Sequence, residues 1–218
     1  MIDLHTHSIF SDGALIPAEL IRRYEYLGYS AVAITDHVDS SNIDFIIPRI
    51  IRVAEDLNKS QSVMVIPGVE ITHVPPKLIR GLVEKARSLG AKLVVIHGET
   101  IVEPVPEGTN MAGIEAGADI LAHPGLITLE AARLASEKGV LLEISGRAGH
   151  SLTNGHVAKT ALEVNARMVL NSDSHSPGDI MTSEFAKKVI EGSGLTKNFH
   201  SELLSNARQL LEGVGNNP

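Results

Sequence analysis

The sequence contains no cysteine and no tryptophan, and these absences narrow the chemistry open to the chain. Without thiols there is no disulfide, thiolate metal site or cysteine nucleophile, so any metal ligands must be histidine or carboxylate. Aromatic residues make up only 3% of the chain, which leaves few platforms on which nucleic-acid bases could stack. The 26 acidic residues outnumber the 19 basic ones, and the formal net charge of −7 disfavours binding to a phosphate backbone. Nucleic acid is therefore the less favoured partner, whereas a small anion stays compatible with this charge if bound cations neutralise its site.

Long apolar runs are also missing. No stretch approaches the roughly 18 residues that would predict a membrane span, and the first residues carry no basic segment typical of a secretion signal. We therefore expect a soluble, cytoplasmic protein without a membrane partner. The chain is 43% hydrophobic and no linker or change of composition divides it, so we expect one domain over residues 1–218. Nothing in the sequence indicates an oligomeric state.

Short apolar runs alternate with segments of helical periodicity along the whole chain. The runs are rich in Val, Ile and Leu, as buried parallel strands are. The expected strands are 1–4, 31–35, 62–66, 92–96, 119–122, 140–144 and 167–170. The expected helices are 17–27, 42–58, 76–89, 109–116, 128–138, 154–165, 179–191 and 199–212. This alternation predicts an α/β fold with a parallel sheet, either open or closed into a barrel.

Histidines and carboxylates follow most of the apolar runs, at the point where each predicted strand ends. In chain order they are His5, His7, Asp12, His37, Glu70, His97, His123, Asp173 and His175. Six of the ten histidines and three carboxylates thus fall at one end of the predicted sheet. Burying so many ionisable groups together without a metal would be costly. The pattern therefore predicts a metal site at the carboxyl ends of the strands, where parallel barrels build their active sites.

Each part of this pattern is weak by itself. A single His-x-His or strand-end histidine is often incidental, and Asp173-Ser174-His175 could be an ordinary turn. Residues two apart on a strand point to the same side, so His5 would face the same way as His7, and Asp173 the same way as His175. Closure of a barrel would place these two pairs side by side. Their convergence favours a closed barrel over an open sheet.

Together the motifs resemble those of the PHP (polymerase and histidinol phosphatase) superfamily. The matching segments are Asp3-Leu4-His5-Thr6-His7 with Ser11-Asp12-Gly13, Thr35-Asp36-His37, Gly68-Val69-Glu70, His97, Ala122-His123-Pro124 and Ser172-Asp173-Ser174-His175. They run from residue 3 to residue 175 in that superfamily's order, so the resemblance covers most of the chain. It implies a distorted (β/α)7 barrel with parallel strands inside and helices outside. The seven apolar runs agree with this fold.

The resemblance also implies two to three divalent cations, for which zinc, manganese and iron are all suitable. The implied ligands are His5, His7, Glu70 and Asp173 for one ion, Glu70, His97 and His123 for a second, and Asp12, His37 and His175 for a third. Asp12 stands where the third site often has histidine. The implied activity is hydrolysis of a small phosphomonoester, as in histidinol phosphatases, by a metal-activated hydroxide. Glu70 and Asp173 would be its central catalytic residues.

The segment 145–150 follows the sixth run and would overhang the same face. Arg147 could clamp a phosphate with two hydrogen bonds, and His150 could hold the phosphate or protonate the leaving group. A solvated loop is the simpler interpretation of Arg147. Asp36 could orient His37 or merely cap a strand. Three histidines match no motif and are interpreted as surface or structural residues: His73, His156 and His200.

Three other functions stay open. The same superfamily includes polymerase-linked 3′–5′ exonucleases and nucleotide phosphodiesterases, but the acidic, aromatic-poor composition favours a small substrate. Amidohydrolases also begin with a strand-end His-x-His, but they usually bridge their metals with a lysine, and Glu70 holds that place here. A non-catalytic regulatory PHP domain would be expected to lack ligands, whereas this chain keeps all nine.

Overall fold

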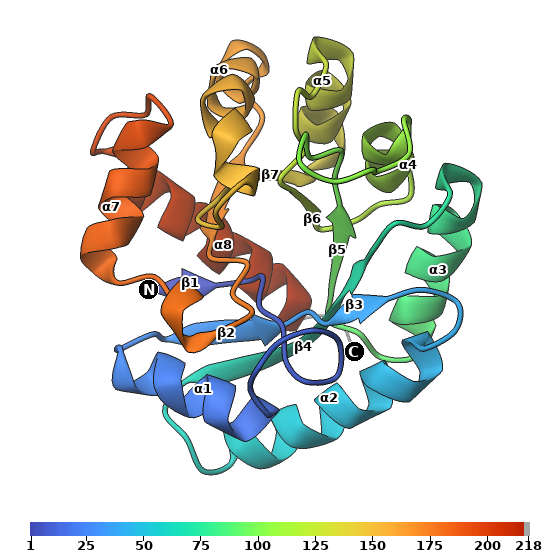
Figure 1. Cartoon of the computed structure of the whole chain (residues 1–218), viewed down its shortest axis with the longest axis vertical. Helices are drawn as coiled ribbons and strands as arrows, with labels where there is room; N and C mark the ends of the chain where they lie inside the picture. The colour runs from blue at the N-terminus through green and yellow to red at the C-terminus, as the bar shows by residue number, and fades with distance from the viewer. Residues whose placement is uncertain (216–218) are drawn as a thin grey trace.

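The computed structural model describes residues 1–215, in which parallel strands form a nearly closed barrel surrounded by helices (Figure 1). The strands are β1 (Ile2–Asp3), β2 (Ala31–Ile34), β3 (His37–Val38), β4 (Met64–Ile71), β5 (Leu93–His97), β6 (Ile120–Ala122), β7 (Leu141–Ser145) and β8 (Met168–Asn171). Their order is β1-β2-β4-β5-β6-β7-β8, with β3 beside β4. A parallel bridge between Thr6 and Ser174 brings the first and last strands together. The predicted distorted (β/α)7 barrel is confirmed.

Helices surround the strands in chain order (Figure 1). They are α1 (Pro17–Tyr26), α2 (Ile43–Asn58), α3 (Pro76–Ser88), α4 (Thr109–Glu115), α5 (Leu129–Lys138), α6 (Asn154–Val164), α7 (Ser183–Gly192) and α8 (Phe199–Gly215). Pro17 and Pro76 open α1 and α3, where a first-turn residue needs no amide donor. The Thr128 side chain accepts a hydrogen bond from the amide of Ala131 and caps α5, and Gly139 ends that helix with a φ of 74°.

The bounds of two predicted elements differ by four or more residues from those in the structure. The third strand continues to Ile71, so Glu70 lies inside β4 rather than beyond its end. The expected helix 179–191 is divided into a short 3₁₀ helix, Pro177–Asp179, and α7. The division follows from Thr182, whose side chain accepts a hydrogen bond from the amide of Phe185 at 3.2 Å and starts a new helix.

The second strand is interrupted at Thr35 and Asp36, which separates β2 from β3. At the interruption, the Thr35 amide donates to the carbonyl of Thr6 at 2.8 Å. Beyond it, His37 pairs in register with Glu70 on β4. The interruption therefore ties the first strand segment to the second and sets His37 beside Glu70.

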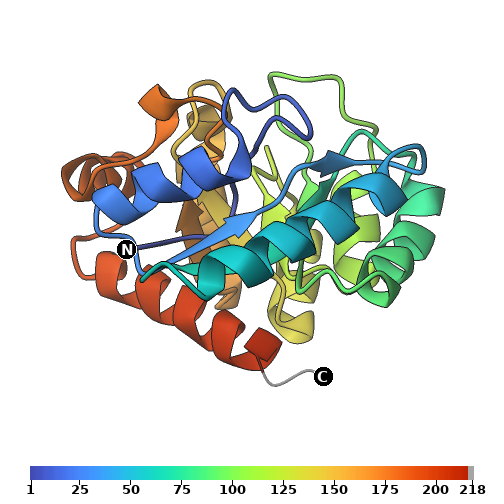
Figure 2. The same ribbon diagram turned by 90° about the horizontal axis from the view of Figure 1, so that it is seen from below.

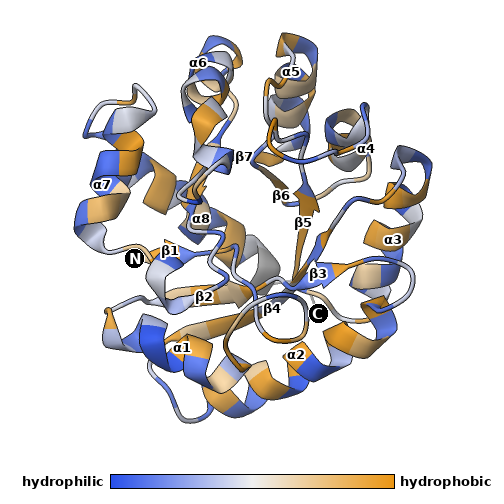
Figure 3. Ribbon diagram, viewed as in Figure 1, coloured by the Kyte–Doolittle hydropathy of each residue, from blue (hydrophilic) through white to orange (hydrophobic). Residues whose placement is uncertain are grey.

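Hydrophobic side chains form two layers, one outside and one inside the barrel. One layer lies between the strands and the outer helices. The other fills the barrel with side chains such as Leu4, Leu93 and Leu141, and Ala207 of α8 packs against it. Figure 2 shows α8 across one end of the barrel and the connecting loops at the other. In Figure 3, β5 and β6 are strongly hydrophobic and the surrounding helices are amphipathic.

Within residues 1–215, no helix combines the length and the hydrophobicity needed to cross a membrane. The expected domain 1–218 includes residues 216–218, which lie outside the described residues. The prediction that residues 1–218 form a single domain stays a prediction.

Candidate metal centre

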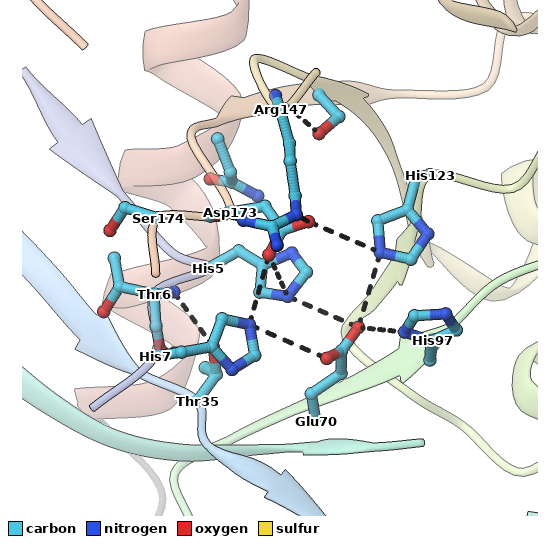
Figure 4. Close-up of polar contacts among 12 residues, drawn as sticks. His5, Thr6, His7, Thr35, Glu70, His97, His123, Arg147, Asp173 and Ser174 are labelled. Carbon is cyan, nitrogen blue, oxygen red and sulfur yellow. Dashed lines mark hydrogen bonds and ion pairs between the residues drawn. The ribbon is translucent and has the colours of Figure 1, made fainter. Parts of the chain in front are cut away.

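Glu70 projects from β4 into the carboxyl end of the barrel and is fully buried. Alternation along the strand turns Ile66 and Glu70 inward, while Val69 and Ile71 pack outward against the helices. Both carboxylate oxygens face histidine nitrogens (Figure 4). Oε1 lies 3.3 Å from Nε2 of His5, 3.2 Å from Nδ1 of His97 and 3.6 Å from Nε2 of His123. Oε2 lies 2.6 Å from Nδ1 of His37 and 3.7 Å from Nε2 of His7. Because each oxygen faces different rings, Glu70 has the position of a bridging ligand.

Asp173 supplies the second central carboxylate. Its Oδ1 lies 3.2 Å from Nε2 of His7 and 3.5 Å from Nδ1 of His175. Its Oδ2 lies 3.7 Å from Nε2 of His123. Since β8 ends at Asn171, this placement depends on the loop after the strand rather than on strand alternation.

Asp12, His37 and His175 gather nearer the pocket mouth. Oδ1 of Asp12 lies 3.4 Å from Nε2 of His37 and 3.2 Å from Nε2 of His175. His7 joins these three in one group whose candidate ligand atoms all lie within 4.8 Å of one another. The Asp12 side chain is 59% exposed, so this group is the most accessible part of the predicted ligand set. The structure thus brings all nine predicted ligands to one place.

Several buried polar atoms at this place have no hydrogen-bond partner. They are Nε2 of His5, both ring nitrogens of His7, both ring nitrogens of His97, Nδ1 of His123 and Oε1 of Glu70. An unsatisfied buried polar group typically costs about 1–3 kcal/mol, so such a concentration needs a compensating partner. Divalent cations would provide it, because groups of three and four of these donor atoms converge within 4.8 Å. The residues present therefore fit a multinuclear metal site.

The pKa values show how strongly charge is concentrated here. Burial would lower the pKa of His5, but the carboxylates of Glu143, Glu70 and Asp173 raise it well above 6.5. Burial would raise the pKa of Glu70, but His5 and two further histidines hold it well below its ordinary value. Burial, reinforced by neighbouring histidines, lowers the pKa of His7. Protons and metal ions would therefore compete for the same atoms.

Glu143 belongs to the site, although the sequence analysis did not identify it. It projects inward from β7, and its Oε2 lies 2.8 Å from Nδ1 of His5 and accepts a hydrogen bond from Nδ2 of Asn171 at 2.9 Å. Both Glu143 and His5 are fully buried. The available signal was an acidic residue inside the apolar run 140–144, at a position whose alternation points into the barrel.

Asp36 contacts the loop that carries Asp12. Its Oδ1 accepts hydrogen bonds from the amides of Ser8 at 2.8 Å and Ser11 at 3.1 Å. The Ser11 hydroxyl also donates to Oδ1, and the Ser8 hydroxyl donates to Oδ2, both at 2.7 Å. His37 instead has Thr72 Oγ1 at 2.7 Å from its Nδ1. Asp36 therefore contacts and positions the loop 8–13, and the two roles considered for it from the sequence, orienting His37 or capping a strand, stay predictions.

Arg147 and His150 both reach the site from the segment after β7. Nη1 of Arg147 donates to the carbonyl of Asp173 at 3.2 Å and lies 2.8 Å from Nδ1 of His175. His150 is buried, and its ring stacks on that of His123 with centroids 4.0 Å apart. Burial, followed by His123, lowers the pKa of His150 to about 3, so its ring is neutral near pH 7. Their roles with substrate stay predictions.

The unmatched histidines divide between the site and the scaffold. His73 lies at the pocket, where its Nε2 is 3.0 Å from Oε2 of Glu103, a residue that no motif contains. His156 is structural, since its Nε2 lies 2.8 Å from the carbonyl of Ile127. His200 is the second residue of α8, the helix that lies at the opposite end of the barrel in Figure 2. The interpretation of His73 as a surface or structural residue therefore did not include its contact with Glu103 at the pocket.

Backbone strain is concentrated at this centre. Four non-glycine residues among 1–215 have positive φ, and three of them lie here: His73 at 53°, His123 at 27° and Asp173 at 53°. Left-handed backbone costs such residues on the order of 1 kcal/mol. Strain of this kind is retained mostly where function requires a particular side-chain direction.

The protein is an α/β barrel with a candidate metal centre. Buried histidines and carboxylates form this centre at the carboxyl ends of the parallel strands. The chain belongs to the PHP domain family, whose model matches residues 3–96. An uncharacterized protein of Methanocaldococcus jannaschii is 48% identical over 215 residues, which are 97% of this chain and 99% of that protein. Ribonuclease P protein component 3 of Methanosarcina mazei is 29% identical over 152 residues, which are 66% of this chain and 56% of that protein.

Solved structures share the fold. A structure of archaeal ribonuclease P with mature tRNA contains a chain that matches with a TM-score of 0.72 at 19% identity, over 98% of this chain and 91% of that one. Histidinol phosphate phosphatase of Lactococcus lactis, crystallised with zinc, L-histidinol and phosphate, matches with a TM-score of 0.63 at 15% identity. That match covers 89% of this chain and 94% of the phosphatase. At these identities the likeness establishes the fold.

Proposed function

We propose that this chain is a metal-dependent phosphoesterase that hydrolyses a small phosphomonoester. The observation that carries the proposal is the position of Glu70, whose two oxygens face different sets of buried histidine nitrogens. Two to three divalent cations, as zinc, manganese or iron, would supply an activated water and neutralise charge on the phosphate. The ligands proposed for them are the nine residues predicted from the sequence.

The pocket above this cluster suits a small substrate. Its volume is about 380 Å³. Its lining includes Asp12, His37 and His175 of the proposed third metal site, and Arg147 and His150 of the segment after β7. Four carboxylates line it, Asp12, Asp39, Glu103 and Asp173, against the one guanidinium of Arg147 among the lining residues. The chain alone would repel a phosphate dianion, and bound cations would reverse this charge. The pocket therefore selects for an anionic substrate only in the metal-loaded protein.

Arg147 is placed to bind phosphate once His175 serves as a ligand. Nδ1 of His175 lies within reach of both Nη1 of Arg147, at 2.8 Å, and the carbonyl of Asp173, at 3.0 Å. With Nε2 of His175 used as a ligand, the ring proton must reside on Nδ1, which then donates to that carbonyl. Arg147 loses an acceptor and can donate to a phosphate oxygen instead. The neutral ring of His150 favours a hydrogen-bonding role over donation of a proton to the leaving group.

The proposal is tested by measuring bound metal and phosphate release on one sample. The substrates are a panel of phosphomonoesters that includes histidinol phosphate and an aryl phosphate. We expect two or three ions per chain together with turnover, and loss of turnover in Glu70→Gln and Asp173→Asn. A matched control is Glu130→Gln, which removes an exposed carboxylate on α5. Fewer than one ion per chain, with no turnover after addition of manganese or zinc, would contradict the proposal.

A second candidate function is that of a ribonuclease P component. It is favoured by the 29% identity to the Methanosarcina mazei protein of that name. It is disfavoured by the net charge of −7, because RNA binding relies on basic side chains that neutralise phosphates. Gel mobility shifts with precursor tRNA and mature tRNA separate the two candidates. Tight, salt-dependent RNA binding without phosphate release would favour the second candidate, and turnover without RNA binding the first.

A further inference from the structure

Glu103 is held over the mouth of the pocket by the loop between β5 and α4. The loop is fixed at its start, where Asn110 Oδ1 accepts from the amide of Glu99 at 2.9 Å and Glu99 Oε1 accepts from the amide of Asn110 at 2.8 Å. Thr100 Oγ1 adds a contact of 2.8 Å to Nδ1 of His150. With the loop held in this way, the half-buried side chain of Glu103 lines the pocket.

Three histidines from three different segments meet this one carboxylate. Oε2 of Glu103 lies 3.0 Å from Nε2 of His73 and 3.1 Å from Nε2 of His97, and Oε1 lies 3.4 Å from Nε2 of His150. The candidate ligand atoms of His73, His97 and Glu103 lie within 4.8 Å of one another. Two histidines and a carboxylate are a common ligand set for zinc, whose ligand atoms at 2.0–2.2 Å stand about 3.3–3.6 Å apart in a tetrahedron. The distances from Oε2 of Glu103 to the ring nitrogens of His73 and His97, 3.0 and 3.1 Å, are shorter than this by a few tenths of an ångström.

His97 contacts both Glu103 at the pocket and Glu70 in the inner cluster, the buried ligands around Glu70. Its Nδ1 lies 3.2 Å from Oε1 of Glu70, and its Nε2 lies 3.1 Å from Oε2 of Glu103. The ring is 3% exposed, and neither nitrogen has a hydrogen bond of good geometry. A neutral imidazole offers one lone pair at a time, so His97 can bind a cation on the outer side or on the inner side, but not on both.

We infer that His73, His97 and Glu103 form a loading site, at which a divalent cation is held before it enters the inner cluster. The side chains of His73 and Glu103 are 38% and 36% exposed, so a hydrated ion can reach them from the pocket. To pass a cation inward, His97 would offer Nδ1 in place of Nε2, and its ring proton would then reside on Nε2, where Glu103 would accept it in a hydrogen bond. Glu70 would replace Glu103 as the carboxylate that supports binding on this side of the ring. The left-handed backbone of His73 would be retained because it directs this ring toward Glu103.

The inference rests on the proposed metal centre, and uptake kinetics test it separately. Metal-free protein is mixed with Co²⁺ in a stopped-flow spectrometer, and absorption of the bound ion is followed to equilibrium. We expect His73→Ala and Glu103→Gln to slow uptake by about tenfold or more, as loss of supporting ligands commonly does for affinity. The number of ions bound by His73→Ala at equilibrium should equal that of the unchanged protein. Glu107→Gln, which removes an exposed carboxylate from the same loop, should leave the rate unchanged.

Unchanged uptake rates in both variants would overturn the loading site. The same holds if Glu103→Gln binds fewer ions at equilibrium while His73→Ala behaves like the unchanged protein, because Glu103 would then only orient His97. An ion missing at equilibrium from His73→Ala would show a resident site and overturn the loading role. If the unchanged protein takes up no ion at all, the proposed metal centre fails as well, which distinguishes the two failures.

Discussion

Nδ1 of His5 lies 2.8 Å from Oε2 of Glu143, and neither side chain is accessible to solvent. The other ring nitrogen of His5, Nε2, faces Oε1 of Glu70 at 3.3 Å. This arrangement keeps the Nδ1 proton on the Glu143 side, so Nε2 is the nitrogen that can exchange its proton for a cation. Asn171 holds Glu143 in turn by donating from its side chain at 2.9 Å. Glu143 therefore positions His5 from behind, on the side away from Glu70.

Replacement of Glu143 by Gln should weaken metal binding while the barrel stays folded. The Gln side chain keeps the size of Glu143 but removes the charge that stabilises the His5 proton, so we expect affinity to fall by about 10–100-fold. Titration against a chelator of known affinity measures the change. Glu130→Gln, on the exposed surface of α5, is the control and should bind as the unchanged protein does. Equal affinities in both variants would show that Glu143 has no such role.

Asp173→Asn should stabilise the metal-free protein and reduce its stabilisation by metal. Burial raises the pKa of Asp173, and the negative charges of Glu70 and Glu143 add to this effect, so the free carboxylate is costly to bury. Asn tolerates the positive φ of this position well. We expect the free energy of unfolding without metal to rise by about 1 kcal/mol. For each metal site of the unchanged protein, an ion at about 100 times its Kd should add about 3 kcal/mol, and Asp173→Asn should lack the increment of the site that Asp173 helps to form.

Thermal unfolding with a chelator and with added zinc measures both effects. A variant that is less stable without metal would show that Asp173 stabilises the fold by itself. A variant that gains as much from zinc as the unchanged protein would exclude Asp173 as a ligand.

Asp36→Ala should free the loop 8–13 from its contacts and disrupt the proposed third metal site, formed by Asp12, His37 and His175. The change leaves the amides and hydroxyls of Ser8 and Ser11 without the acceptor that they have now. We expect a loss of about 2–4 kcal/mol in the free energy of unfolding, as for other broken buried hydrogen-bond networks. Asp12 would no longer be held beside His37, so one ion fewer should be bound at equilibrium. Elemental analysis counts the ions, and Asp56→Ala, on an exposed side chain of α2, is the control.

Asp3 should make the stability of the metal-free protein fall as the pH rises through the weakly acidic range. Burial raises the pKa of Asp3 to about 6, although Ser172, Tyr24 and His5 donate hydrogen bonds that lower it. A folded-state pKa above the unfolded value of 3.8 means that the folded protein holds this proton more tightly. The resulting stabilisation is complete below pH 3.8 and is lost as the pH rises through 6, by about 3 kcal/mol.

Denaturant unfolding of the unchanged protein and of Asp3→Asn, in the presence of a chelator, measures this effect. The difference in free energy of unfolding, unchanged protein minus variant, should decrease between pH 4 and pH 7. A difference that is constant across this range would show that Asp3 keeps an ordinary pKa in the folded protein.

Much of the site could be predicted because its motifs are local. The expected strands 92–96, 119–122 and 167–170 end just before His97, His123 and the segment that carries Asp173, within one residue of the ends of β5, β6 and β8. Hydrophobic runs and strand-end residues depend on neighbours in the chain, so the sequence displays them directly. Glu103 carried no such signal, because its partners come from segments 30, 6 and 47 positions away and only the path of its loop brings them together.

The sequence by itself determined the parallel α/β order, the end of the strands that carries the polar residues, and nine of the residues gathered there. These follow from hydrophobic periodicity and from the chemistry of histidine and carboxylate, which each residue has whatever its surroundings. Only the tertiary structure decided which atoms face one another. Glu143 lies 138 positions from His5 in the chain but 2.8 Å from it in space, and Asp36 contacts Ser8 rather than its neighbour His37. Such pairs arise from barrel closure and from the backbone path at the loops, because contact between distant residues depends on the fold as a whole.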